Sequence, residues 1–146
     1  MENTQSTVSL LNEITQNADM GRATITQLLG DVENEQMKQH LHKELATYED
    51  IGKRASAMLA VNGKTPKQQS AVAKLGAKVN ITMNTLADKS PRHMSEMLMQ
   101  GCQMGVTSIT EALKDYAGDA NDGAVALAQR LQKAENDYEG ELKKFL

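Results

Sequence analysis

Apolar and small residues recur along most of this chain at alternating intervals of three and four positions. In residues 6–29 these positions are Leu11, Ile14, Ala18, Gly21, Ile25 and Leu28. The spacing places all six on one face of an α-helix and is typical of a helix in a bundle. The same pattern predicts four further helices, at residues 32–61, 66–87, 91–117 and 124–145.

Capping and turn residues separate these segments. Gly30 is a predicted helix C-cap, and Asp31 is predicted to begin the next helix. A proline at the first helical position, preceded by Ser or Thr, is a strong signal for a helix start. The other boundaries are marked by Asn-Gly at 62–63, Thr-Pro at 65–66, Ser-Pro at 90–91 and the turn-rich residues 118–123.

Inward positions are predicted on each helix from its apolar stripe. For residues 32–61 they are Met37, Leu41, Leu45, Tyr48, Ile51, Ala55 and Met58. For residues 91–117 they are Leu98, Cys102, Gly105, Ile109, Ala112 and Tyr116. For residues 124–145 they are Ala124, Leu127, Leu131, Ala134, Tyr138, Leu142 and Phe145.

Part of the sequence occurs twice. Residues 20–29, MGRATITQLL, are echoed by residues 104–113, MGVTSITEAL, and Leu-x-Lys followed by Tyr-Glu occurs both at 41–49 and at 131–139. Gly21 and Gly105 take equivalent places on the stripes of the first and fourth predicted helices. We expect these small residues to allow close backbone approach or to leave room for Tyr48 and Tyr138 from the partner helices.

The architecture predicted from these elements is all-α, with a single domain covering residues 1–146. Two related helical hairpins form an antiparallel four-helix bundle. At about 1.5 Å per residue, the helix at 66–87 is long enough to cross from one end of the bundle to the other. A bundle with one long crossover connection is the ferritin-like arrangement.

Composition is that of an ordinary globular chain with an aliphatic core, because only 3% of the residues are aromatic and there is no Trp. No apolar run approaches the roughly 20 residues that span a bilayer, and the polar start lacks the features of a signal peptide. The single Cys102 cannot form an internal disulfide. We therefore expect a cytoplasmic protein without a membrane span.

Charge is segregated along the chain. Residues 51–93 contain eight basic side chains and one acidic side chain, whereas residues 1–50 and 94–146 each contain nine acids. The basic segment is interpreted as a helix lying against an acidic bundle, and docking on an anionic surface is the alternative. Because the segment has no aromatic residue on which a base could stack, no nucleic acid partner is predicted.

Three segments carry a resemblance to a known group: KVNITMNTL at 78–86, HMSEML at 93–98 and QGCQMGVT at 100–107. With them, the whole chain resembles the small ferritin-like four-helix proteins of Gram-positive gut bacteria, most of which have no assigned function. Ferritin-like spore-coat proteins are a more distant relation. The resemblance implies the bundle fold, and it raises the question of a metal centre between the hairpins.

Ferritin-like proteins that bind two metal ions place one Glu on each of two helices and Glu-x-x-His on each of the other two. This sequence has no Glu-x-x-His, because Thr47 follows Glu44 and Tyr138 follows Glu135 at that spacing. The resemblance implies Glu13, Glu44, Glu96 and Glu135 as the carboxylates of a di-iron or di-manganese centre, if one is present. In the alternative interpretation these acids contact solvent, and the tyrosines fill the core with their hydroxyls hydrogen-bonded to neighbours.

Other candidate chemistry lies around Cys102. Met94, Met97, Met99 and Met104 are nearby in sequence, and soft sulfur ligands suit Cu(I). Core packing or a methionine-lined partner surface is the preferred interpretation. Cys102 is interpreted as a buried structural thiol without an activating histidine, and His93 with Glu96 as a surface ion pair. His40 and His42 are two positions apart and do not face each other.

The sequence therefore predicts a non-enzymatic, ferritin-like bundle that acts through protein–protein interaction or assembly. We expect a homodimer or larger homo-oligomer, or an unknown protein partner. No catalytic, cofactor-binding or metal-binding residue and no cofactor is assigned. A ferritin-like oxidase or metal-storage protein is the alternative function.

Overall fold

The computed structural model of this chain describes residues 3–66 and 88–146. These residues form four α-helices and no strand: α1 (Thr4–Leu29), α2 (Glu35–Val61), α4 (Pro91–Tyr116) and α5 (Asp122–Leu142), followed by the short 3-10 helix η1 (Lys143–Phe145). The all-α prediction is confirmed for this part of the chain. The helix predicted at 66–87 lies outside the described residues.

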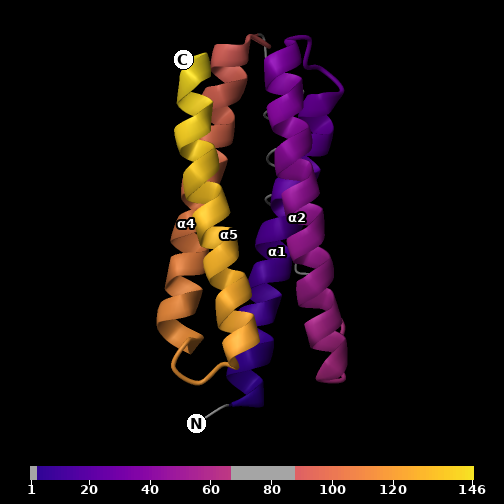
Figure 1. Cartoon of the computed structure of the whole chain (residues 1–146), viewed down its shortest axis with the longest axis vertical. Helices are drawn as coiled ribbons and strands as arrows, with labels where there is room; N and C mark the ends of the chain where they lie inside the picture. The colour runs from indigo at the N-terminus through magenta and orange to yellow at the C-terminus, as the bar shows by residue number, and fades with distance from the viewer. Residues whose placement is uncertain (1–2, 67–87) are drawn as a thin grey trace.

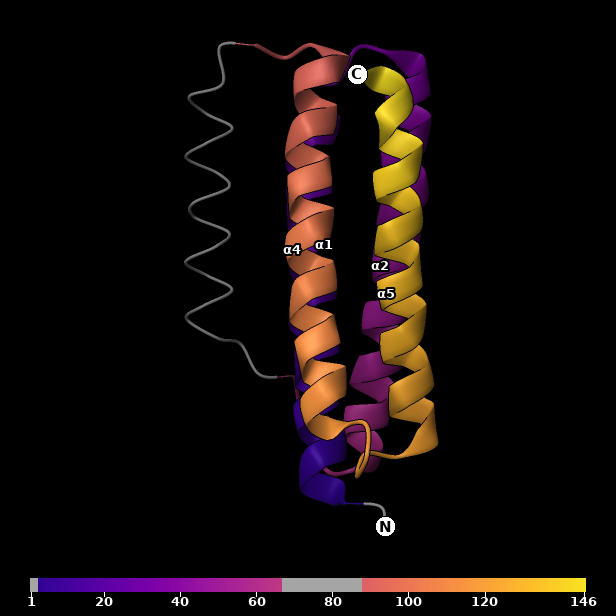
Figure 2. The same ribbon diagram turned by 90° about the vertical axis from the view of Figure 1, so that its left-hand side faces the viewer.

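The four helices stand side by side as two antiparallel pairs (Figure 1). α1 packs against α2 in the first hairpin, and α4 packs against α5 in the second hairpin. Across the hairpins, α4 lies beside α1 and α5 lies beside α2 (Figure 2). α1 and α5 run in one direction and α2 and α4 in the other, so α2 ends at the opposite end of the bundle from the start of α4 (Figure 1).

Each helix begins at a side chain that accepts a hydrogen bond from the first turn, as expected for N-cap residues. These caps are Asn3, Asn34, Ser90 and Asn121. The prediction that Asp31 begins the second helix was wrong. The backbone N–H groups of Asp31 and Val32 both donate to Leu28 O at 3.0 Å, so these residues close the end of α1 and the cap falls at Asn34.

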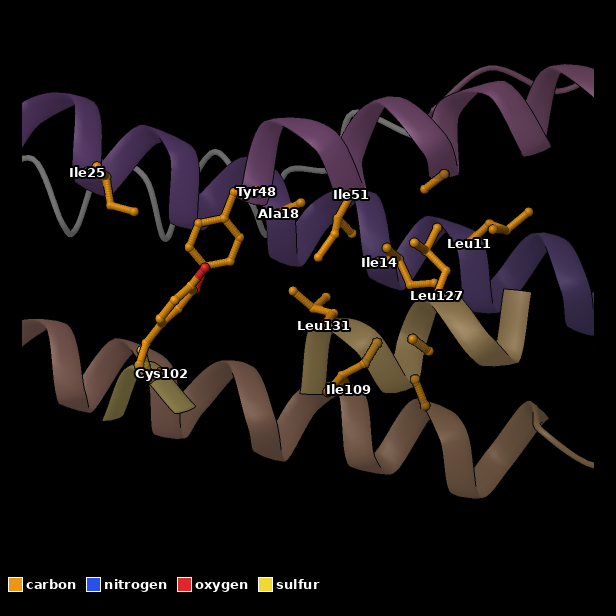
Figure 3. Packing of buried hydrophobic residues seen from close by; sticks show 14 of the residues in the cluster. Leu11, Ile14, Ala18, Ile25, Tyr48, Ile51, Cys102, Ile109, Leu127 and Leu131 are labelled. Carbon is orange, nitrogen blue, oxygen red and sulfur yellow. The ribbon is translucent and has the colours of Figure 1, made fainter. Parts of the chain in front are cut away.

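The core is aliphatic along most of its length, as the composition predicted. Figure 3 shows Ile14 of α1, Ile51 of α2, and Leu127 and Leu131 of α5 pointing into the space between the hairpins. The inward stripes predicted for α1 and α4 are confirmed at most positions. The buried members on those helices are Leu11, Ile14, Ala18, Ile25, Leu28, Leu98, Cys102, Ile109 and Ala112.

The stripes of α2 and α5 differ from the prediction at two important places. Leu45 and Ala134 are only partly buried, while the neighbouring carboxylates Glu44 and Glu135 are 1% and 2% exposed. The helices are therefore rotated slightly from the orientation that would place every apolar residue inward. His40 is also buried, one turn before Glu44.

Each of the two duplicated glycines lies at a close contact between the two helices of its own hairpin. A Cβ atom added at Gly21 would lie 2.6 Å from Cζ of Tyr48, which confirms the predicted room for that ring. A Cβ atom at Gly105 would lie 2.6 Å from Cδ of Glu135. The residue that fills the space beside Gly105 is thus Glu135, and the prediction of Tyr138 was wrong.

Charged residues are unevenly distributed around the bundle. Asp, Glu, Lys and Arg make up three of the 26 residues of α1 and five of the 26 of α4, but eight of the 27 of α2 and seven of the 21 of α5. α1 lies beside α4, and α2 lies beside α5 (Figure 2). The side of the bundle formed by α1 and α4 is therefore poor in charge, and the side formed by α2 and α5 is rich in charge. Among the described residues, no helix has the length and apolar character needed to cross a membrane.

Candidate functional site

The most unusual feature of the core is a group of polar side chains between α2 and α5, where the two hairpins meet. We call it the interhairpin polar cluster, and its members are His40, Glu44, Thr47, Tyr48, Glu135, Tyr138 and Glu141. The first four belong to α2 and the last three to α5. On α2, His40, Glu44 and Tyr48 recur at four-residue intervals with Thr47 beside Tyr48, and the α5 members recur at three-residue intervals. Such spacings place the side chains on one side of each helix.

Glu135 is one of the two almost fully buried carboxyl groups of the cluster. Its carboxyl group lies against the backbone of α4 at Gly105, in space that any larger residue there would occupy. The Tyr48 hydroxyl donates a hydrogen bond to Glu135 Oε2 at 3.1 Å, across the interface between the hairpins. Glu135 Oε1 has no hydrogen-bond partner among residues 3–66 and 88–146.

The surroundings of Glu135 favour its neutral form. Burial raises the pKa of Glu135 to about 8, although Tyr48 and the nearby Asn17 amide offset part of this effect.

Asn17 itself donates to Gly105 O at 3.0 Å and so joins α1 to α4 at the same level. Cys102 is also buried nearby, and burial raises the pKa of its thiol. Tyr48 points across the core from α2 toward the side on which Cys102 lies (Figure 3).

Glu44 has a different partner. Its Oε2 lies 2.5 Å from His40 Nε2, one turn earlier on α2, and both side chains are almost fully buried. Burial raises the pKa of Glu44, and the contact with His40 opposes this effect. His40 Nδ1 faces Glu141 Oε2 of α5 at 3.5 Å, so the imidazole lies between a carboxylate of each hairpin.

The aromatic members close the cluster. The Tyr138 ring packs edge-on against His40, with centroids 5.6 Å apart. Its hydroxyl donates to Thr47 Oγ1 at 2.6 Å, and Thr47 Oγ1 donates to Lys43 O at 3.1 Å. Both tyrosine hydroxyls therefore bond to a neighbour, as the alternative interpretation of the sequence predicted.

The four glutamates suggested by the ferritin-like resemblance do not come together. Glu44 and Glu135 are in the core, but Glu96 is exposed and pairs with Arg92 at 3.3 Å. Glu13 is only partly buried and lies eight residues before Gly21, which is about 12 Å along α1. Thus the prediction that such acids contact solvent holds for Glu96 and is wrong for Glu44 and Glu135.

These positions do not fit a centre that holds two metal ions. Such a centre needs carboxylates from four helices directed at one point, whereas among residues 3–66 and 88–146 only α2 and α5 supply buried carboxylates. In the described part of the chain, no three His, Cys, Asp or Glu side chains are grouped as they would be around a metal ion. The buried carboxylates instead contact His40 and Tyr48 within the protein.

The sulfur-containing residues of α4 are also dispersed. Met94 and Cys102 are buried in the core, Met97 and Met99 pack at its edge, and Met104 is 50% exposed. This arrangement agrees with core packing, and the prediction of Cys102 as a buried thiol is confirmed. His93 Nδ1 lies 3.9 Å from Glu96 Oε2 in a loose contact at the surface, as predicted.

Sequence reasoning missed three participants: His40, Thr47 and Glu141. A signal for one of them was present, because His40, Glu44 and Tyr48 follow each other at intervals of four and must share a helical face. Glu141 gave no such signal, since its contact with His40 depends on the register between α5 and α2.

The described residues also form an open surface groove of about 450 Å³ beside the C-terminus. It is lined by Arg92, Glu96, Met99, Gln100, Gln103 and Leu146. No member of the interhairpin polar cluster is among these lining residues. Comparison with known proteins gives no further assignment, because no protein-family model, curated protein or solved structure matches this chain.

Proposed function

We propose that this protein is a ferritin-like helical bundle that acts by association with a second copy of itself, without chemistry of its own. The directions of the helices support the ferritin-like part. A chain that leaves α2 at one end of the bundle and enters α4 at the other has the up-down-down-up order of bundles with one long crossover.

The observation that carries the proposed association is the lack of charge on the surface of α4. From residue 97 to residue 110 this helix has no Asp, Glu, Lys, Arg or His, although many of these positions are exposed. The exposed residues are Gln100, Gly101, Gln103, Met104, Thr107, Ser108 and Thr110. Interface cores are depleted of charged residues and enriched in Met, which makes this face suited to another protein surface.

A second copy is the occupant that the charge distribution favours. The uncharged stretch of α4 adjoins α1, which has few charges of its own, and together they form the charge-poor side of the bundle. A two-fold dimer would bury this side against itself and leave the charged α2 and α5 side in solvent. Gly101, with nothing within 4 Å of the place where its Cβ would be, permits close approach of another helix.

The test is sedimentation velocity over a range of protein concentrations. We expect a dimer, and we expect Met104→Glu to weaken self-association at least about tenfold because it places a charge in the interface. Val61→Glu is the matched control, because Val61 is 87% exposed at the end of α2 and outside this face. A wild-type protein that stays monomeric at its highest attainable concentration would refute the proposal, as would equal effects of the two substitutions.

A further inference from the structure

The two hairpins are joined through polar contacts that include buried acids. Tyr48 bonds to Glu135, Tyr138 bonds to Thr47, and His40 faces Glu141. Each contact connects α2 of the first hairpin with α5 of the second. A buried carboxyl group at such an interface is far more costly when charged than when neutral, unless a cation is beside it.

We propose that the contact between the two hairpins depends on a proton held by the buried Glu135, so that the bundle loses stability when that proton leaves. This property does not depend on self-association. It follows from where the carboxyl group lies and from what surrounds it on every helix.

No cation faces Glu135 among the described residues that surround it. α1 presents the Asn17 amide, and α4 presents the backbone at Gly105 together with the Cys102 thiol. α2 presents the Tyr48 hydroxyl and the acidic Glu44, and α5 itself carries Tyr138 and Glu139 nearby. The two basic groups that contact carboxyl groups of the cluster are engaged elsewhere: His40 contacts Glu44, and Lys43 Nζ bonds to Glu141 Oε1 at 2.7 Å.

The direction of the pH dependence follows from the folded and unfolded pKa values. Glu135 has a pKa of about 8 in the folded protein and an ordinary value of 4.5 when exposed. Between these values the folded state keeps the proton and the unfolded state has released it, so unfolding releases a proton. The stability that the neutral Glu135 contributes is therefore fully present below about pH 4.5 and is lost as the pH rises to about 8. In this range the folding equilibrium constant falls by up to about a factor of ten for each pH unit.

Glu44 acts in the same direction. Burial raises its pKa too, while His40 and Lys43 lower it and Glu141 raises it. Since His40 lies against Glu44, this carboxylate has a partner for its charge that Glu135 lacks. The sharper loss of stability is therefore assigned to Glu135.

The experiment is urea unfolding from about pH 5 to about pH 9 in the presence of a chelator, on wild type, Glu135→Gln and the exposed control Glu111→Gln. Gln keeps the shape of a neutral carboxyl group but cannot ionise. We expect the wild type and Glu111→Gln to lose stability together between about pH 5 and about pH 8. We expect the slope for Glu135→Gln to be smaller by about one proton.

An infrared titration of the folded protein gives a second measurement that does not depend on unfolding. The infrared carbonyl band of neutral carboxylic acid should persist above about pH 6, where exposed glutamates are ionised. Glu135→Gln should remove the part of this band that remains at the highest pH. The proposal is overturned if this band is absent near neutral pH or if Glu135→Gln keeps the wild-type slope. It is also overturned if Mn²⁺, added without chelator, stabilises the wild type at about pH 8 but not Glu135→Gln, because the carboxylate would then be a metal ligand.

Discussion

Substitution of Gly105 by Ala provides the most direct test of how α4 and α5 pack. In an unobstructed helix interior, Gly→Ala stabilises a protein by roughly 0.5–1 kcal/mol. At Gly105 the new methyl group would occupy the space of the Glu135 carboxyl, whose Cδ and Oε1 lie 2.6 Å and 2.7 Å from the place where the Cβ would be. Overpacking of this kind costs about 1–3 kcal/mol. Withdrawal of the carboxyl would also lose its bond from Tyr48, which is worth about 1 kcal/mol.

The net expectation for Gly105→Ala is a loss of about 1–3.5 kcal/mol in the free energy of unfolding. Gly101→Ala is the matched control, one turn earlier on α4, with nothing within 4 Å of its Cβ position. It should stabilise the monomer by about 0.5–1 kcal/mol. The assay is urea unfolding followed by circular dichroism, at one protein concentration low enough for the protein to be monomeric. The m value is checked for constancy. If Gly105→Ala stabilises the protein as much as Gly101→Ala does, the packing of Glu135 against α4 is wrong.

Two further substitutions test individual hydrogen bonds of the core. Tyr48→Phe removes the hydroxyl that donates a hydrogen bond to Glu135. It should lower the free energy of unfolding, measured with urea at neutral pH, by about 1–3 kcal/mol because the buried acceptor keeps no equivalent partner. No change would show that the hydrogen bond is absent in solution. Ser95→Ala removes a buried hydroxyl that donates a hydrogen bond to Leu142 O at 2.6 Å, and it should lower stability by about 1 kcal/mol. The control is Ser108→Ala at an exposed position, which should change stability by less than about 0.5 kcal/mol. Equal effects of the two serine substitutions would contradict the docking of the end of α5 on α4.

The helices could be predicted from sequence because their signals are local. Apolar spacing, the Ser-Pro start at 90–91 and the turn at 118–123 each depend on neighbouring residues, and α4 and α5 occur within a few positions of the prediction. Asp31 was misassigned because a capping residue was present both there and at Asn34. Only the hydrogen bonds of the last turn of α1 distinguish the two.

The polar cluster could not be predicted in the same way, because an apolar stripe is drawn on the assumption that charges face outward. The apolar stripe predicts Leu45 and Ala134 as inward for that reason, whereas Glu44 and Glu135 are the buried residues. Adjacent residues of a helix differ in direction by less than half a turn. A modest rotation of the helix about its axis therefore decides which of the two residues faces the core. What decides it is tertiary: the space beside Gly105 of α4 accepts the Glu135 carboxyl group, and Tyr48 of α2 donates a hydrogen bond to it.

The internal repeat shows why related hairpins need not form a symmetric site. Gly21 and Gly105 are separated by 84 residues, but Tyr48 and Tyr138 are separated by 90. Both connecting loops have the same length, so three of the six additional residues lie in α4 after Gly105 and three lie in α5 before Tyr138. This added length alone would leave Tyr138 opposite Gly105. In the second hairpin, however, Tyr138 lies one turn beyond the residue that meets Gly105, and that residue is Glu135. The equivalent glycine thus receives an aromatic ring in one hairpin and a carboxyl group in the other, which is why the core has one strongly buried acid at this level and not a symmetric pair.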